Sequence, residues 1–468
     1  MNWFRALILS SFLPLSLPAA FAQQTPTLLH GAVVAPDKAI MDGWIEIQDG
    51  KIVLVSDQKP NVPGALVVET GGTIYPGFVD LHNHPTYSVF PRWEPNSLFV
   101  DRYVWRGLPG YGQRVGTPGR LLQEDDQAFC DLSEFGDIRA LVAGTTSIHG
   151  TSAQKKNTVP DCILGLVRHL DWKSDSTSGG RVSSGTVVGA IDVDPITPTR
   201  AKEIRKQIAD GEIKLFLIHL AEGAPNDDKS IKEFSTLKGL GLLTKNTAII
   251  HGAALHAAEF DQMQKAGTAL IWSPKSNIVL YGTTTDVASA MRSQVTVALA
   301  PDWSITGSTN MLGEISYAHA YLKNTNQPVF TDKQLFEMAT SAPARLAGLE
   351  NEIGTLKVNS RADLFILRSA PKQPDDVYTA LTQANPQDVV LVLVGGNPVY
   401  GLDRLVAPII NTSLAPVSVE PLNVCGEVRA FVTTKDSRLI DTWANLRSRL
   451  QVRLAAYDLQ LAPLFECP

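Results

Sequence analysis

The sequence has little of what would direct it to several classes of protein. Its 468 residues include only four cysteines, and a net charge of −6 leaves no basic excess, which argues against a nucleic-acid partner. Beyond the N-terminus, no apolar run is long enough to cross the ~30 Å hydrocarbon layer of a membrane. The contents of hydrophobic (44%) and charged (19%) residues are typical of a globular enzyme, and the length predicts a large domain plus a smaller one.

The first 22 residues predict a secretory signal peptide. Arg5 supplies positive charge, residues 6–17 are apolar, and A-F-A at residues 20–22 forms a small-x-small cleavage site. The apolar run is too short for a membrane anchor, and no cysteine follows the cleavage site to carry a lipid. We therefore expect a periplasmic or secreted protein that has no membrane association after signal cleavage.

The number of cysteines is even, so all four could pair in disulfides in an oxidising compartment. Pairing Cys425 with Cys467 would close the C-terminal tail and leave Cys130 with Cys162. Each loop would contribute roughly 3–4 kcal/mol in the chain-entropy model. Four free buried thiols are the alternative. None of the cysteines has zinc-finger spacing to a histidine, so we do not expect a cysteine-bound metal.

The two ends of the chain have β-strand patterns, and the middle alternates between strands and helices. Residues 27–74 alternate in hydropathy around an Asp49-Gly50 hairpin signal, and residues 349–400 return to strand character. Repeated β-α units in between predict a parallel sheet closed into a distorted (β/α)8 TIM barrel. The expected order is a signal peptide (1–22), the N-terminal half of a β-sandwich (23–74), the barrel (75–348), the C-terminal half of the β-sandwich (349–410) and a C-terminal extension (411–468).

The first barrel strand ends in two histidines, within P-G-F-V-D-L-H-N-H at residues 76–84. Side chains at i and i+2 of a strand point to the same side, so His82 and His84 can bind one metal ion. An H-x-H pair alone is a weak signal, and two ordinary histidines at this spacing are the alternative.

Further candidate ligands end other predicted strands, namely His219, His251 and Asp302. Imidazoles and a carboxylate suit a divalent metal with a position left for water. Zinc lowers the pKa of bound water from 15.7 to about 7. Glu222 follows in H-x-x-E, and we assign it proton transfer from the water to the leaving group. His251 would orient the nucleophile or polarise the substrate, and Asp302 would share the proton. An exposed loop glutamate, a core histidine and a helix-capping aspartate are the respective alternatives.

The long segment 85–136 interleaves aromatic residues with arginines, directly after the histidine strand. Such a loop could form the wall of an apolar, anion-accepting substrate pocket, or a packed surface subdomain. We name Trp93 and Trp105 from it, together with Trp303 and His149, as candidate substrate contacts; a structural role for His149 is equally open.

Several motifs together resemble the amidohydrolase superfamily, in the branch of triazine-chlorohydrolase-like enzymes and aminohydrolases (deaminases). They are the segment at 76–84, H-L-A-E at 219–222, H-G at 251–252, W-S-P-K-S-N-I-V-L-Y-G at 272–282, P-D-W at 301–303 and the closing stretches at 339–349 and 353–364. The resemblance covers about residues 27–400. It implies a barrel with a composite β-sandwich, a metal on His82, His84, His219 and Asp302, and proton handling by Glu222 and His251.

The resemblance also has a departure. Binuclear members use a carboxylated lysine on the fourth strand, and the candidate strand 186–191 has none, while Lys214 begins the next strand. We therefore expect one divalent metal, with Zn²⁺ favoured and Fe²⁺ or Mn²⁺ open. The expected activity is hydrolysis of a non-peptide C–N bond, by deamination or amide cleavage, of a small aromatic or heterocyclic substrate. Hydrolytic dehalogenation, dipeptide cleavage, a silent metal-containing binding protein and homo-oligomerisation stay open.

Overall fold

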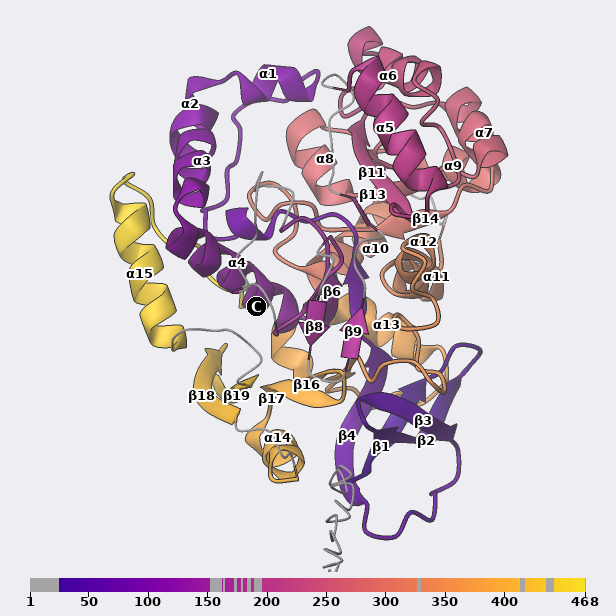
Figure 1. Ribbon diagram of the computed structural model, residues 1–468, viewed down its shortest axis with the longest axis vertical. Coiled ribbons are helices and arrows are strands. Elements are labelled where there is room, and N and C mark those ends of the chain that lie inside the picture. The colour runs from indigo at the N-terminus through magenta and orange to yellow at the C-terminus, as the bar shows by residue number, and fades with distance from the viewer. Residues whose placement is uncertain are drawn as a thin grey trace, which may run out of the picture.

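The computed structural model describes residues 25–151, 162, 165–171, 175–177, 180–182, 187–188, 196–325, 330–412, 417–434 and 442–467. The expected signal peptide lies outside these ranges. Figure 1 shows a central αβ body and a β-rich body at the bottom of the view, with α15 (Trp443–Ala455) along one side.

The central body is a TIM-like barrel of parallel strands, which confirms the predicted fold class. One arc of paired strands is β5 (Phe78–Asp80), β6 (Thr145–Ile148) and β7 (Arg168–His169). The other arc is β10 (Val187–Val188), β11 (Leu215–Leu220), β12 (Thr247–His251), β13 (Ala269–Trp272) and β14 (Val297–Leu299). A parallel bridge between Asn83 and Asp302 connects the β5 side to the β14 side. The polar ends of these strands therefore meet at one end of the barrel.

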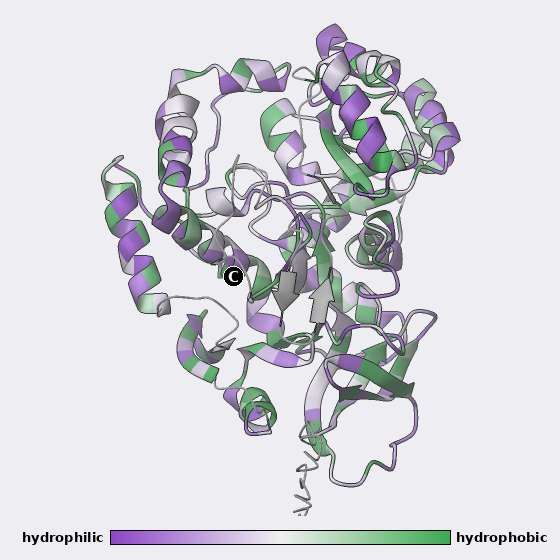
Figure 2. Ribbon diagram, in the orientation of Figure 1, coloured by the Kyte–Doolittle hydropathy of each residue, from purple (hydrophilic) through white to green (hydrophobic). Residues whose placement is uncertain are grey.

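Helices surround the barrel because their apolar faces cover its strands. They are α4 (Asp126–Leu141), α5 (Pro198–Ala209), α6 (Asp228–Gly239), α7 (Ala257–Ala266), α8 (Pro274–Tyr281), α9 (Val287–Arg292), α10 (Met311–Asn324), α11 (Asp332–Met338) and α12 (Ser341–Leu346). Figure 2 shows hydrophobic colouring on the barrel strands and hydrophilic stretches on helix α5 in front of them. A small hairpin, β8 (Asp175–Thr177) with β9 (Gly180–Val182), follows β7.

The segment between β5 and α4 is a run of short helices. It contains η1 (Pro85–Tyr87), α1 (Arg102–Arg106), α2 (Pro109–Tyr111), η2 (Gly112–Gly116) and α3 (Thr117–Glu124). The isolated bridge between Asp101 and Gly223, and a hydrogen bond from the Ala224 amide to the Val100 carbonyl (2.7 Å), attach this segment to the loop after β11. The segment therefore lies over the end of the barrel where the ligand-type side chains gather.

Both ends of the chain build one nine-stranded sheet, in the order β18-β19-β17-β16-β15-β4-β1-β2-β3. The strands are β1 (Thr27–Val34), β2 (Ala39–Gln48), β3 (Lys51–Ser56), β4 (Leu66–Pro76), β15 (Leu364–Leu367), β16 (Val389–Val394), β17 (Asn397–Gly401), β18 (Val417–Val424) and β19 (Glu427–Thr434). Asp49 and Gly50 form the β2–β3 turn with φ of 50° and 76°, as their hairpin signal predicts. Residues past 410 add β18 and β19, so the sheet extends into the segment that we expected to be a separate extension. Helices α13 (Asp376–Gln383), η5 (Pro386–Asp388) and α14 (Asp403–Ile410) complete this region.

Buried ion pairs and disulfides hold these regions together. Nε of Arg168, in β7, lies 2.5 Å from Oδ2 of Asp363, which directly precedes β15. This ion pair therefore connects the barrel to the nine-stranded sheet. Disulfides join Cys130 to Cys162 and Cys425 to Cys467, which confirms the expected pairing. No helix within the described ranges is long and apolar enough to cross a membrane.

Candidate active site

The site residues stand at the ends of barrel strands, where the sequence predicts them. His82 and His84 follow β5, His219 lies in β11, His251 ends β12 and Asp302 follows β14. The backbone turns sharply at these ends, because Ala221, His251 and Asp302 have φ of 52°, 67° and 61°. Non-glycine residues rarely adopt this left-handed conformation, and such strain is concentrated at functional sites.

These side chains converge on one point. Oδ1 of Asp302 lies 2.9 Å from Nε2 of His82 and 3.3 Å from Nε2 of His84. The ligand-type atoms of His82, His219 and His251 lie within 4.8 Å of one another, and so do those of His82, His84 and Asp302. Such spacing allows a single cation, with bonds of roughly 2.0–2.2 Å, to contact nitrogen and oxygen donors together.

The protonation states fit a cation as well. Burial lowers the pKa of His82 and of His251 to about 4, and it holds the pKa of His219 well below 6.5. Burial would raise the pKa of Asp302, but its pairing with His82 and His84 holds that pKa well below the usual range. Near neutral pH the site therefore offers neutral imidazoles and a carboxylate, which is the donor set that a divalent metal requires.

Helix α8 orients two of these groups from behind. Oγ of Ser276 donates a hydrogen bond to Oδ2 of Asp302 at 2.6 Å. Oδ1 of Asn277 lies 2.9 Å from Nδ1 of His251, which puts the proton of that imidazole on Nδ1. The Nε2 lone pair of His251 is therefore directed at the converging atoms. This support matches the second layer of hydrogen bonds typical of metal and catalytic histidines.

Glu222 lies beside this cluster. It is only 5% exposed, and its Oε2 is 3.7 Å from Nε2 of His251. Its backbone carbonyl accepts from the amide of Arg102 at 3.2 Å, so the start of helix α1 is anchored to the loop that carries the glutamate. The carboxylate is thus held within reach of a water or leaving group at the histidine cluster, as proton transfer requires.

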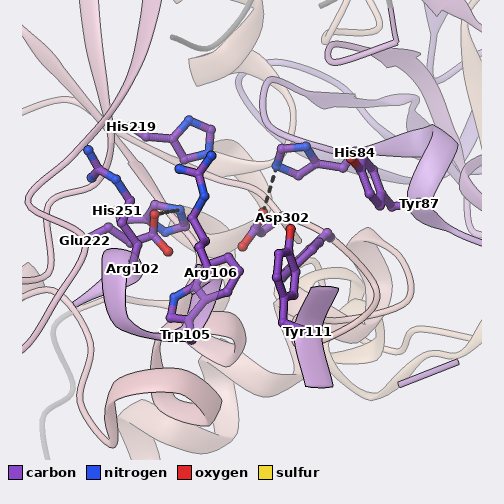
Figure 3. A pocket seen from close by; sticks show the side chains of 11 residues that line it. His84, Tyr87, Arg102, Trp105, Arg106, Tyr111, His219, Glu222, His251 and Asp302 are labelled. Carbon is purple, nitrogen blue, oxygen red and sulfur yellow. Dashed lines mark ion pairs between the residues drawn. The ribbon is translucent and has the colours of Figure 1, made fainter. Parts of the chain in front are cut away.

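A cavity of about 230 Å³ opens over the cluster. Figure 3 shows Trp105, Arg106 and Tyr111 in front of the cluster, Glu222 and His251 on one side, and His84 and Tyr87 on the other. The lining residues are His84, Tyr87, Arg102, Trp105, Arg106, Tyr111, His219, Glu222, His251, Asp302 and Trp303. Ring centroids lie 5.5 Å apart for Trp105 and Trp303, so large aromatic faces form the wall.

The four candidate substrate contacts divide into two groups. Trp105 and Trp303 line the cavity. Trp93 is outside the lining and packs behind it, with its ring 6.3 Å from that of Trp105. His149, at the end of β6, is 1% exposed and also outside the lining, and its amide donates to the carbonyl of Asp80 at 2.8 Å. The structure therefore places two of the four candidates at the cavity.

Sequence reasoning did not single out other residues of the cavity. Arg106, Tyr87 and Tyr111 belong to the aromatic and arginine-rich segment, but only their spacing in short helices brings them to the lining. Lys214, the remaining candidate for a bridging ligand, is exposed at the start of β11, at the opposite end of that strand from Leu220. The side chains of β10, on the expected fourth strand, lie outside the described ones.

Comparisons with known proteins agree with this geometry. Residues 199–399 match the model of the amidohydrolase family. Over this stretch the chain is similar to the amidohydrolase family. It is 25% identical over 413 residues to a 5-methylthioadenosine/S-adenosylhomocysteine deaminase of Nitratidesulfovibrio vulgaris, covering 80% of this chain and 91% of that protein. A deaminase of the same name from Caldanaerobacter subterraneus is 23% identical, covering 77% and 89%.

Solved structures of other proteins share the fold of this chain. An adenosine deaminase from Xanthomonas campestris with bound zinc superposes with a TM-score of 0.64 at 17% identity, over 83% of this chain and 97% of that one. A triazine hydrolase from Arthrobacter aurescens gives 0.65 at 16%, over 83% and 99%. At these identities the likeness establishes a TIM-like barrel with a separate β-rich domain.

Proposed function

We propose that this protein is an amidohydrolase, a metal-dependent hydrolase that removes an amino group from, or opens an amide in, a small ring-containing molecule. The observation that carries the proposal is the placement of Glu222 beside converging histidines and one carboxylate, inside an aromatic cavity. The sequence likeness to deaminases over 80% of the chain supports the C–N bond as the target.

Each residue of the site has a role in this reaction. One divalent metal, which we take to be zinc, would be held by His82, His84, His219 and Asp302 and would supply Lewis-acid activation of a water. Glu222 accepts a proton from the attacking water and returns it to the leaving nitrogen. His251, fixed by Asn277, turns the lone pair of Nε2 toward the cluster, where it would orient the attacking water. Ser276 fixes the carboxylate of Asp302, which shares the proton of the water.

The cavity wall supports a flat substrate. Trp105, Tyr111 and Trp303 present rings with centroids 5.1–6.1 Å apart, which suits stacking of an aromatic or heterocyclic ring. Burial raises the pKa of Tyr111 to about 12, so this wall stays uncharged near neutral pH. The guanidinium of Arg106 adds a positive charge at the same cavity. We therefore favour an amino-substituted heterocycle.

The test is the release of ammonia or of a carboxylic acid by residues 23–468 loaded with zinc, against a panel of aminopurines, aminopyrimidines, aminotriazines and cyclic or aryl amides. Turnover of at least one amine or amide by the wild type, lost in Glu222→Gln and kept in the exposed control Glu212→Gln, supports the proposal. Release of halide from a halogenated heterocycle without any ammonia or acid would replace C–N cleavage by dehalogenation. No turnover across the panel would contradict the proposed function.

We also propose that the protein is exported. The two disulfides support this proposal, because cytosolic thiols are kept reduced. Expression of the full chain with its own N-terminus should yield periplasmic protein that begins near Gln23, as N-terminal sequencing would show. Retention of an uncut chain in the cytosol would contradict it.

A further inference from the structure

The last residue of helix α8, Tyr281, faces the glutamate of the site. Its hydroxyl lies 2.7 Å from Oε1 of Glu222, and Nε1 of Trp105 lies 2.8 Å from the same hydroxyl. Tyr281 is 5% exposed and is not among the residues that line the cavity, whereas Trp105 and Glu222 are. A chain of hydrogen bonds therefore runs from the aromatic wall, through a tyrosine behind it, to the proton-transfer group.

The chemistry of the three groups fixes the direction of these bonds. An indole N–H can only donate, so the oxygen of Tyr281 accepts from Trp105. The single proton of Tyr281 must then point at Glu222, whose Oε1 accepts it. Burial and the nearby carboxylate of Glu222 also hold the pKa of Tyr281 well above its ordinary value, so the hydroxyl keeps its proton. The carboxylate oxygen Oε1 is committed to this bond, and Oε2 is the atom turned toward His251.

We propose that Tyr281 is a positioning residue, which holds Glu222 in the rotamer that presents Oε2 to the reacting atoms, and that Trp105 fixes Tyr281 in turn. This proposal rests on one part of the proposed function, namely the role of Glu222 in proton transfer. Helix α8 then orients three groups of one site, since Ser276, Asn277 and Tyr281 bind Asp302, His251 and Glu222. Gly282, with φ of 71°, ends the helix directly after the tyrosine, so that the hydroxyl reaches the glutamate from the helix end.

Tyr281→Phe removes only the hydroxyl. The free energy of a hydrogen bond to a charged group corresponds to roughly a 10- to 100-fold change in a rate constant. We therefore expect kcat to fall by about that factor. KM should stay within about threefold, because Tyr281 is outside the cavity lining. In the Glu222→Gln background, the same change should have almost no further effect on kcat, because the basic carboxylate that Tyr281 positions is already lost. Tyr378→Phe, which removes the hydroxyl of a buried tyrosine on α13 and keeps its ring beside Phe336, is the matched control and should leave kcat unchanged.

Two results would overturn the proposal. One is a kcat of Tyr281→Phe equal to that of the wild type. The other is a loss that multiplies fully with that of Glu222→Gln, which is what a general structural disturbance would produce. If Tyr281→Phe does not fold, Trp105→Phe is the variant to test, because it keeps an aromatic ring and removes the N–H that donates to Tyr281. Trp105→Phe should lower kcat, and an unchanged kcat would overturn the proposal.

A second measurement separates this proposal from the proposed function. Crystal structures of wild type and Tyr281→Phe with zinc show the Glu222 rotamer whether or not a substrate is known. A Glu222 side chain that turns away or becomes disordered only in the variant supports the positioning role, even if no substrate is ever turned over. An unchanged Glu222 in the variant overturns it, even in an active hydrolase.

Discussion

Two histidine sites in this molecule, a single histidine on the sheet and a cluster in the barrel, lie next to carboxylates and differ in the direction of their pKa shifts. On the nine-stranded sheet, His30 lies between two carboxylates, with Nε2 2.6 Å from Asp42 and Nδ1 2.5 Å from Glu69. Burial lowers its pKa, but the bonds to Glu69 and Asp42 outweigh burial and raise the pKa above 6.5. In the barrel, His82 lies 2.9 Å from Asp302, yet burial brings its pKa to about 4.

The difference shows that a neighbouring carboxylate does not by itself decide what a histidine does. The side chain of His30 is 24% exposed and both of its nitrogens face a carboxylate, an arrangement that favours its protonated form. The side chain of His82 is 1% exposed and shares one carboxylate with His84. Burial without enough negative charge leaves neutral imidazoles, whose lone pairs can bind a metal.

The largest expected effect comes from Glu222→Gln, which keeps the shape of the side chain and removes its basic oxygen. Because general acid–base transfer typically contributes about 10²–10⁴-fold, we expect kcat to fall by about 10³-fold or more. Zinc content should stay at the wild-type value, as measured by atomic absorption. Substantial turnover by the variant would sink the assigned role of Glu222.

The buried histidines should make the metal-free protein sensitive to acid. Since His82 and His251 have pKa values of about 4 in the folded protein and about 6.5 when unfolded, the unfolded chain binds more protons between these pH values. The free energy of unfolding should thus have its full value above pH 6.5. It should decrease toward pH 4, by up to about 3 kcal/mol for each histidine. Urea unfolding of apo protein across this window measures it, and a flat profile would show that these imidazoles titrate normally.

A smaller effect is expected from Asn277→Ala, which removes the group that orients His251. Loss of such an orienting partner typically costs about 10–100-fold in metal affinity or activity. Steady-state kinetics and zinc competition with a chelator would show which of the two changes. Asn246→Ala, at a half-buried residue directly before β12 and outside the cavity lining, is the control, and equal effects of both variants would remove the special role of Asn277.

The smallest effect concerns His30. A histidine with a raised pKa stabilises the fold fully below pH 6.5, and this contribution is lost as pH rises through the raised value. His30→Gln should therefore lower Tm by about 1–2 °C below pH 6.5, because exposed ion pairs contribute little. The difference should shrink at alkaline pH. A difference that grows with pH would reverse the comparison with the barrel histidines.

Much of the site could be predicted because its chemistry stands at strand ends. His82, His84, His219, His251 and Asp302 each follow or end an apolar run, and a parallel barrel must bring such ends together. The fold class could also be predicted, because β-α repeats between strand patterns at both chain ends are compatible with few architectures.

The rest depended on geometry that spacing does not encode. Tyr281 meets Glu222 only because α8 and the loop after β11 cross behind the cavity. The Trp105 and Trp93 side chains come from one loop with the same composition, yet only Trp105 reaches the lining. The left-handed conformations of Ala221, His251 and Asp302 also carry no residue-type signal, because none of the three is glycine.

The measurement that tests the account most directly is the metal content of purified residues 23–468, never exposed to chelator, beside that of His82→Ala. We expect close to one divalent metal per chain in the wild type and almost none in the variant, because His82 belongs to both groups of converging ligand atoms. Two metals per chain would contradict the single site. No metal in the wild type would contradict the metal-dependent hydrolase itself.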